Sequence, residues 1–276
     1  MLPLKDRNPT SRFAVLTAVI IAVNVGIFFF WQNPFPSGDQ AEEDQAVFFY
    51  CQALVPWEVT HGKPLADGGT EAVEAIQRSL DPENTNPGVG REVVDLTSKE
   101  CPNKSVWLSL LTAMFLHGGL LHIGGNMLFL WVFGNNVEDK VRLVRYALFY
   151  LVCGFAASGA HILSDTNSAI PVVGASGAIA GVLGAYLVMF PRRRVLTLLL
   201  FYFITTVELP AYVLLGFWFV LQFLPILQDL GGAGSGVTDV AVWAHIGGFV
   251  AGALIAFLMF PREQGDPHAY ERRPIL

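Results

Sequence analysis

PVVGASGAIAGVLGAYLVMF, residues 171–190, is the stretch that decides the fold. It carries no charge, and a helix of this length, at ~1.5 Å per residue, crosses a hydrocarbon layer of ~30 Å. Small residues crowd around Ser176 near its start, and such residues let membrane helices approach one another closely. The stretch therefore predicts a membrane-spanning helix with a serine near its beginning.

The composition of the whole chain agrees with a membrane protein. Of 276 residues, 53% are hydrophobic and 14% are charged, with a mean hydropathy of +0.48, whereas about a quarter of an ordinary soluble domain is charged. The three cysteines, Cys51, Cys101 and Cys153, are too few for a disulfide scaffold and lack zinc-ligand spacing. We predict an all-α membrane protein with several spans, without a metal or a nucleic-acid partner.

Six apolar segments are predicted as membrane-spanning helices. They lie at 13–31, 118–133, 143–163, 171–190, 195–227 and 240–260. The fifth is too long for one straight helix and contains Glu208, Leu209 and Pro210, so we expect part of it to be a bent helix or an interfacial loop. Residues 32–105 are rich in Pro, Gly and acidic residues, which predicts an extramembrane loop with one short amphipathic helix at 71–80.

The basic residues are unevenly divided between the two sides of this arrangement. Twelve of the 17 Lys and Arg residues lie in the tails 1–12 and 261–276 or in the two connections on the same side. By the positive-inside rule, both termini are cytoplasmic and the 32–105 loop is extracytoplasmic. Because disulfides persist outside the cytoplasm, Cys51 and Cys101 in this loop can form one. The alternative is that both remain free thiols. The short N-terminal tail lacks an Arg- and Ser-rich presequence, which favours a bacterial cell membrane.

Polar side chains inside the predicted spans are functional candidates because burying them in lipid is costly. The region of the second span carries His117, His122 and Asn126, the fourth span carries Ser176, and the sixth carries His245. These three spans run in the same direction, and His122, Ser176 and His245 each follow the predicted outer boundary by four or five residues. They therefore share a depth of ~6–8 Å, and His122 and Asn126, four residues apart, share one helix face.

A serine and a histidine at one depth permit nucleophilic catalysis, in which the imidazole removes the hydroxyl proton and later protonates the leaving amine. No Asp or Glu lies at that depth, so the pattern predicts a dyad without an orienting carboxylate. His122, Asn126 and the Ser176 N–H are candidate donors to an oxyanion. The alternatives are a serine that packs or bonds to its own helix, and histidines with structural roles.

The residues needed for other classes of intramembrane protease are missing from this sequence. A site-2-type metalloprotease needs HExxH, whereas His117 and His122 are five apart with no Glu between them. A presenilin-like protease needs intramembrane aspartates, and the predicted spans contain none. GASGA around Ser176 lacks the second glycine of the GxSxG motif, so the nucleophile turn of the soluble hydrolases is not indicated. A channel or transporter would need inverted repeats or midplane charges, which this sequence does not have.

Three motifs resemble the rhomboid family of intramembrane serine proteases, in a region that covers residues 107–252. They are HGGLLHIGGN at 117–126, GASGAIAG at 174–181 and AHIGGFVAG at 244–252, in the family's order and spacing. The resemblance implies a six-helix rhomboid-like bundle, with a catalytic core at 106–260. It implies transmembrane protein substrates and membrane lipid as partners, and no cofactor.

The resemblance also implies roles for individual residues. Ser176 matches the family's nucleophile and His245 its general base and acid. His122 and Asn126 match the oxyanion donors, beside the Ser176 amide. Gly174 matches the glycine that lets the serine turn face the site. His117, which supports the loop before the second span in the family, is implied to be structural.

Glycine spacing adds an argument that is independent of the resemblance. Gly177 and Gly181 form GxxxG, as do Gly248 and Gly252. Such repeats let helix backbones meet closely, so we expect the fourth and sixth helices to approach within reach of a hydrogen bond between Ser176 and a histidine of the sixth helix.

The sequence departs from the family's pattern at three places. Ala180 stands where many members carry an aromatic residue that stacks on the catalytic histidine, so His245 must be positioned in another way. Leu108 follows Trp107 where an Arg is often found, in a segment, 103–116, that we expect to be a membrane-dipping hairpin. The 32–105 loop is long, and the resemblance assigns it no role. A non-catalytic rhomboid-like protein that binds membrane clients is the alternative, but such proteins lack the serine or the histidine.

Overall fold

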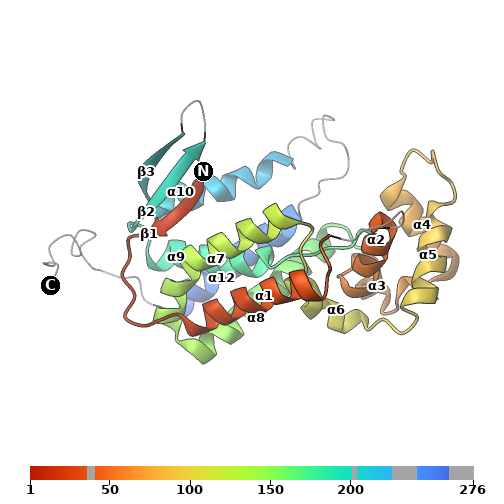
Figure 1. The fold of residues 1–276 in the computed structure, drawn as a ribbon, viewed down its shortest axis with the longest axis horizontal. Helices are drawn as coiled ribbons and strands as arrows, with labels where there is room; N and C mark the ends of the chain where they lie inside the picture. Colours follow the sequence, from red (N-terminus) through yellow and green to blue (C-terminus); the bar gives the residue numbers. More distant parts are fainter. Residues whose placement is uncertain (36–40, 201–203, 226–240, 261–276) are drawn as a thin grey trace, which may run out of the picture. The chain divides into compact units, whose positions relative to one another are not determined.

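The computed structural model describes residues 1–35, 41–200, 204–225 and 241–260, and these are mostly helical (Figure 1). The α-helices are α1 (Val15–Phe30), α2 (Ala41–Gln52), α3 (Pro56–His61), α4 (Gly69–Leu80), α5 (Val89–Glu100), α6 (Val106–Thr112), α7 (Leu120–Val141), α8 (Leu143–Ser164), α9 (Ser176–Met189), α10 (Ala211–Leu221) and α12 (Val242–Met259). The 3₁₀ helices are η1 (Leu65–Asp67) and η2 (Ala113–Phe115), and the strands are β1 (Leu2–Asp6), β2 (Arg194–Leu200) and β3 (Ile204–Pro210).

The described residues divide into two compact units. The first consists of Met1–Ala22, Gly124–Ala157 and the described part of Ser176–Leu276, and the second of Val23–Ile123 and Ser158–Ala175. The division therefore falls within the helices α1, α7 and α8, and at the start of α9.

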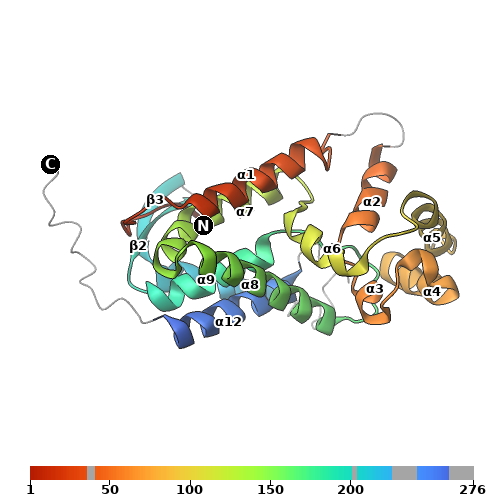
Figure 2. The same ribbon diagram turned by 90° about the horizontal axis from the view of Figure 1, so that it is seen from below.

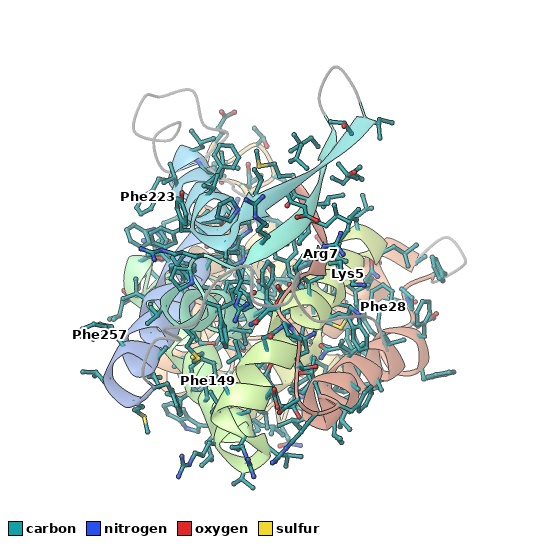
Figure 3. All side chains as sticks on the ribbon, turned by 90° about the vertical axis from the view of Figure 1, so that its left-hand side faces the viewer. Lys5, Arg7, Phe28, Phe149, Phe223 and Phe257 are labelled. Atoms are coloured by element: carbon teal, nitrogen blue, oxygen red, sulfur yellow. A yellow bond between two sulfur atoms is a disulfide. The ribbon has the colours of Figure 1, made fainter. Side chains whose placement is uncertain are left out.

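Among the described helices, α8 and α12 are long and apolar enough to cross a membrane. A third span results if α6 with η2 and the following α7 count as one, although the chain bends by 78° between them. Shorter apolar helices are α1, α9 and the helix that begins at Ala211. Phe257, 65% exposed, points outward from α12, as expected of a side chain that faces lipid (Figure 3). Helices thus occupy the predicted spans 13–31, 118–133, 143–163 and 240–260.

The fourth predicted span is too long at its start, because α9 begins only at Ser176. The N–H of Val172 donates to the carbonyl of Leu54 (2.7 Å), in an isolated antiparallel bridge, and this replaces a helical hydrogen bond. Gly174 has φ +132°, which is outside the helical region and rarely adopted by residues with a side chain. The residues before Ser176 are therefore a non-helical approach to the helix.

The expectation of a helical span at 195–227 is wrong for its first half, and so is the expectation of an all-α chain. β2 and β3 pair antiparallel, from Arg194 opposite Pro210 to Leu200 opposite Ile204, and β1 pairs antiparallel with β2 on the other side (Figure 1). An apolar run such as RVLTLLL does not by itself distinguish a buried strand from a helix. α10 begins only after Pro210, whose fixed φ suits the start of a helix.

Within the first unit, a polar cluster around Asp6, at the end of β1, joins the N-terminal residues to α7, α9 and β3. Its Oδ2 accepts hydrogen bonds from the Tyr186 hydroxyl (2.7 Å) and from Asn136 Nδ2 (2.6 Å). Arg7 forms an ion pair with Glu208 of β3 (2.9 Å). Burial raises the pKa of Asp6 from 3.8 to about 7, although these hydrogen bonds favour the carboxylate.

This raised pKa predicts that the protein loses stability as the pH rises. A carboxyl group whose pKa is higher in the folded state stabilises the fold fully below the unfolded value, near 4, and this stabilisation is lost as the pH rises through about 7. At ~1.4 kcal/mol per pKa unit, and with Asp6 only half-buried, we expect a loss of about 1–4 kcal/mol. The melting temperature in detergent should fall between pH 5 and pH 8 in the wild type. An equally steep fall in Asp6→Asn would contradict this assignment.

Residues 41–105 form a small helical domain, whereas we expected a loop with one short helix (Figure 2). The helix predicted at 71–80 is confirmed as α4, which buries Ala72, Ala75 and Ile76 on one face. The other helices were missed because the Pro- and Gly-rich composition indicates a loop, while the apolar faces are short. The buried side chains that pack together here are those of Tyr50, Val55, Trp57, Leu65, Ala72, Ala75 and Ile76, with Ala169 from the segment between α8 and α9.

A disulfide and a buried ion pair lie where this domain leads into α6. Cys51, near the end of α2, is bonded to Cys101, which directly follows α5, so the pairing that the sequence left open is formed. Lys104 Nζ lies 2.5 Å from Glu58 Oε2, and the two side chains are 3% and 2% exposed. Burial raises the pKa of Glu58, and the charge of Lys104 opposes that rise. The chain is thus fixed at two neighbouring points before α6 begins.

Removing the disulfide is expected to destabilise this domain by about 4 kcal/mol, the chain-entropy value for a loop of 50 residues. In the variant with Cys51→Ser and Cys101→Ser, limited proteolysis should cut within 41–105 at a lower temperature than in the wild type. Addition of a reductant should shift the wild type to the behaviour of the variant and leave the variant unchanged. Equal protease resistance of the two proteins would contradict the prediction.

Candidate active site

Ser176 is the first residue of α9, and the backbone before it prepares this position. The N–H of Gly174 donates to the carbonyl of Ala113 (2.8 Å), and the positive φ of Gly174 turns the chain into the helix. The first N–H groups of a helix have no partner within it, and the helix dipole is positive at this end. The serine hydroxyl therefore lies where a helix favours negative charge.

The segment that leads to Ser176 is fixed by the helical domain of residues 41–105. Besides the bridge from Val172 to Leu54, the N–H of Ala169 donates to Ser79 Oγ of α4 (3.0 Å). Two further hydrogen bonds join Trp57 N–H to the carbonyl of Ser168 (2.9 Å) and Thr60 Oγ1 to the carbonyl of Thr166 (2.8 Å). The domain to which the sequence assigned no role thus contacts residues 166–172, and Ser176 follows shortly after them in the chain.

α9 and α12 pack closely, at the positions where the glycine spacing predicted it. A Cβ atom added to Gly248 would collide with the carbonyl oxygen of Gly177, and one added to Gly252 with the carbonyl oxygen of Gly181. Backbone thus lies against backbone, as in small-residue interfaces of membrane helices. This packing confirms the expected approach of the fourth and sixth predicted helices.

Ser176 and His245 face each other across this interface. His245 belongs to the first turn of α12, and its Nε2 lies 2.8 Å from Ser176 Oγ, a hydrogen-bond distance. The other ring nitrogen, Nδ1, lies 2.8 Å from Oε1 of Gln222, which directly follows α10. The arrangement can deprotonate the serine hydroxyl, which is the first requirement of nucleophilic catalysis.

Gln222 is a site residue that the sequence reasoning missed. It lies inside the segment 195–227, for which the sequence predicted only an interruption at Glu208, Leu209 and Pro210. Yet an amide among apolar residues satisfies the criterion that singled out the serine and the histidines, since polar groups within spans are costly. Searching the predicted spans for every polar side chain would therefore have included Gln222 among the candidates.

Asn126 and His122 lie one turn apart on α7. Asn126 is 8% exposed, and within the described ranges its Nδ2 has no hydrogen-bond acceptor, which leaves a buried donor available. His122, in the second unit, accepts a hydrogen bond at Nδ1 from the N–H of Gly118 (3.2 Å), so its Nε2 carries the proton of the neutral ring. Both side chains are therefore able to donate.

His117 is fully buried in the second unit. Its N–H donates to Gln32 Oε1 (3.0 Å), and its carbonyl accepts from Gln32 Nε2. The side chain of Gln32, just after α1, thus pairs with the backbone immediately before α7. The ring of His117 lies 5.2 Å from that of His122, edge to face.

Comparison with known proteins gives matches to the rhomboid family. RHOMBOID-like protein 6, mitochondrial, of Arabidopsis thaliana is 27% identical over 275 residues, which cover 94% of this chain and 73% of that protein. Rhomboid protease GluP of Bacillus subtilis is 34% identical over 150 residues, 54% of this chain and 25% of that protein. RHOMBOID-like protein 1 of Arabidopsis thaliana is 32% identical over 165 residues, 58% of this chain and 36% of that protein.

These relatives differ in how much of their length the chain covers, since it spans about a quarter of GluP and about a third of RHOMBOID-like protein 1. The family's own domain, the Rhomboid domain, matches residues 104–262. This region is more than half of the chain and contains the three motifs that carry the resemblance. The chain therefore belongs to the rhomboid family.

Proposed function

We propose that this protein is an intramembrane serine endopeptidase in which Ser176 is the nucleophile and His245 the general base and acid. The observation that carries the proposal is the distance of 2.8 Å between Ser176 Oγ and His245 Nε2, at an interface of two backbones in close contact. A serine that served only packing would not need an imidazole at hydrogen-bond distance.

The reaction follows from these two side chains. His245 Nε2 accepts the proton of Ser176 Oγ as the oxygen attacks the carbonyl carbon of the scissile peptide bond. The imidazolium then gives this proton to the nitrogen of the leaving amine, and the C–N bond breaks. Water, deprotonated by the same nitrogen, hydrolyses the acyl-enzyme and regenerates the serine.

The tetrahedral intermediates carry a negative oxygen, and we assign its stabilisation to three sources. The first N–H groups of α9 lie at the positive end of that helix. Asn126 Nδ2 is a buried donor without an acceptor among the described residues. The resemblance to the family assigns the same role to His122, whose protonated Nε2 is able to donate.

The proposed substrates are membrane-anchored proteins. A transmembrane helix has its backbone carbonyls bonded internally, so it must unwind locally before a serine can attack one of them. Segments with Gly, Pro or other small residues are therefore favoured. We further propose that residues 106–260 are the catalytic core, that both termini are cytoplasmic in a cell membrane, and that cleavage occurs near the outer face, as the distribution of Lys and Arg indicates.

The test is cleavage of a fluorogenic transmembrane peptide by the purified full-length protein in detergent and in proteoliposomes. A fluorophosphonate, which reacts with activated serines, should label Ser176 as identified by mass spectrometry. A soluble peptide with the same scissile sequence serves as the control and should be cleaved more slowly. Absence of cleavage and of labelling across several substrates and lipids would refute the proposal and favour a client-binding rhomboid-like protein.

A further inference from the structure

Gln222 contacts His245 in a way that decides which ring nitrogen carries the proton. Its Oε1 lies 2.8 Å from His245 Nδ1, and its Nε2 donates to the carbonyl of Trp218, four residues earlier (3.1 Å). The second contact fixes the orientation of the amide, because a flipped amide would place its oxygen against the oxygen of Trp218. The group that faces His245 is therefore an acceptor.

An acceptor at Nδ1 requires that Nδ1 carry the hydrogen of the neutral imidazole. Nε2 then has a free lone pair, and this nitrogen lies 2.8 Å from Ser176 Oγ. The neutral ring is thus held in the one tautomer that accepts the hydroxyl proton of the serine. The opposite tautomer would place a hydrogen between Nε2 and the serine, and proton transfer could not begin.

We propose that Gln222 is a positioning residue for His245, so that Ser176, His245 and Gln222 act as a triad whose third member is a neutral amide. This inference rests on the proposed function. In Ser-His-Asp enzymes, replacing the Asp by Asn lowers kcat by ~10⁴-fold, because the amide favours the wrong tautomer. Here the NH₂ group of Gln222 donates to the carbonyl of Trp218, so the amide oxygen faces His245 and the wrong tautomer is not favoured.

An aromatic side chain near His245 comes from α10, whereas the family's pattern places one at the position of Ala180. Trp218 of α10 places its ring 5.9 Å from the ring of His245, at an angle of 41°, and stacks on Phe249 of α12 (6.1 Å). α10 thus contributes an aromatic contact to His245, and Gln222, directly after it, contributes a hydrogen bond. The histidine is positioned from α10, while Ala180 on α9 is fully buried.

The test compares three substitutions at this position, in the full-length protein with a transmembrane peptide substrate. Gln222→Met keeps the approximate volume and removes the acceptor, and Gln222→Ala removes both. Gln222→Glu loses the hydrogen bond to the carbonyl of Trp218, but a carboxylate has only acceptors, so an oxygen can face Nδ1 without that contact. We expect kcat to fall ~10–100-fold in the Met and Ala variants with KM changed less than ~2-fold, and Gln222→Glu to recover most of kcat. Val220→Ala, an exposed site near the end of α10 and two residues before Gln222, is the matched control and should retain the wild-type kcat.

A second measurement reports the tautomer directly. In protein with ¹⁵N-labelled histidine, the spectrum of the wild type minus that of His245→Ala should show a protonated Nδ1 and an unprotonated Nε2 at neutral pH. In Gln222→Met, the two tautomers should mix. A protonated Nε2 in the wild type would overturn the inference.

The outcomes separate this inference from the proposed function. If the wild type neither cleaves nor reacts with a fluorophosphonate, the proposed function fails and the role of Gln222 in it fails as well. If cleavage requires Ser176 and His245 but Gln222→Met keeps the wild-type kcat, only the inference fails. If Gln222→Met and Gln222→Glu lose kcat equally and both melt at a lower temperature, Gln222 has only a structural role, and the inference is overturned as well.

Discussion

Ser176→Ala is expected to abolish peptide-bond cleavage, with kcat lower by at least ~10³-fold, because no other group can form the acyl-enzyme. His245→Ala should cause a loss of similar size, since the serine then has no base. The two residues act as one unit, so the double variant should be no slower than either single variant. Initial rates with a fluorogenic transmembrane peptide, at equal amounts of folded protein, measure all three.

A matched serine provides the control. Ser158→Ala removes a hydroxyl from α8, a different helix that is long and apolar enough to cross a membrane. This variant should keep kcat within ~2-fold of the wild type. Full activity in Ser176→Ala would contradict its role as nucleophile. A double variant much slower than the single variants would show that the two side chains act independently, in conflict with the proton transfer between them.

Gly252→Ala is expected to lower both stability and activity, although it adds one methyl group. Its Cβ would collide with the carbonyl oxygen of Gly181, and the atoms around it are backbone, which cannot move away as a flexible side chain can. Such overpacking costs about 1–3 kcal/mol. The two helices would have to separate, and a displacement of His245 by ~1 Å from Ser176 costs on the order of 10²-fold in rate.

The control for this substitution is Gly26→Ala in α1, where an added Cβ would meet no atom within 4 Å. Because alanine favours helix by up to ~1 kcal/mol over glycine, this variant should melt at the same or a higher temperature. The melting temperature in detergent and kcat for the transmembrane peptide are the two measurements. Wild-type values for both in Gly252→Ala would show that the contact of α9 with α12 is not needed for the site.

The sequence by itself determined much of this protein. Apolar runs with few or no charges predicted the helices now seen as α1, α7, α8 and α12, because burying a charge in lipid is costly. The glycine spacing predicted the contact of α9 with α12, since only residues without a side chain permit it. The three motifs identified the rhomboid family, and its domain matches that part of the chain.

Only the tertiary structure decided the remaining features. β2 pairs with β1, at the N-terminal end of the chain, and with β3, and an apolar run does not reveal whether such partners exist. The bond between Cys51 and Cys101 depends on how α2 and α5 meet. Gln222 reaches His245 only because α10 ends beside α12, and a hydrogen bond between residues 23 apart depends on that placement. Sequence patterns report local periodicity and cost of burial, whereas partners distant in the chain are chosen by packing.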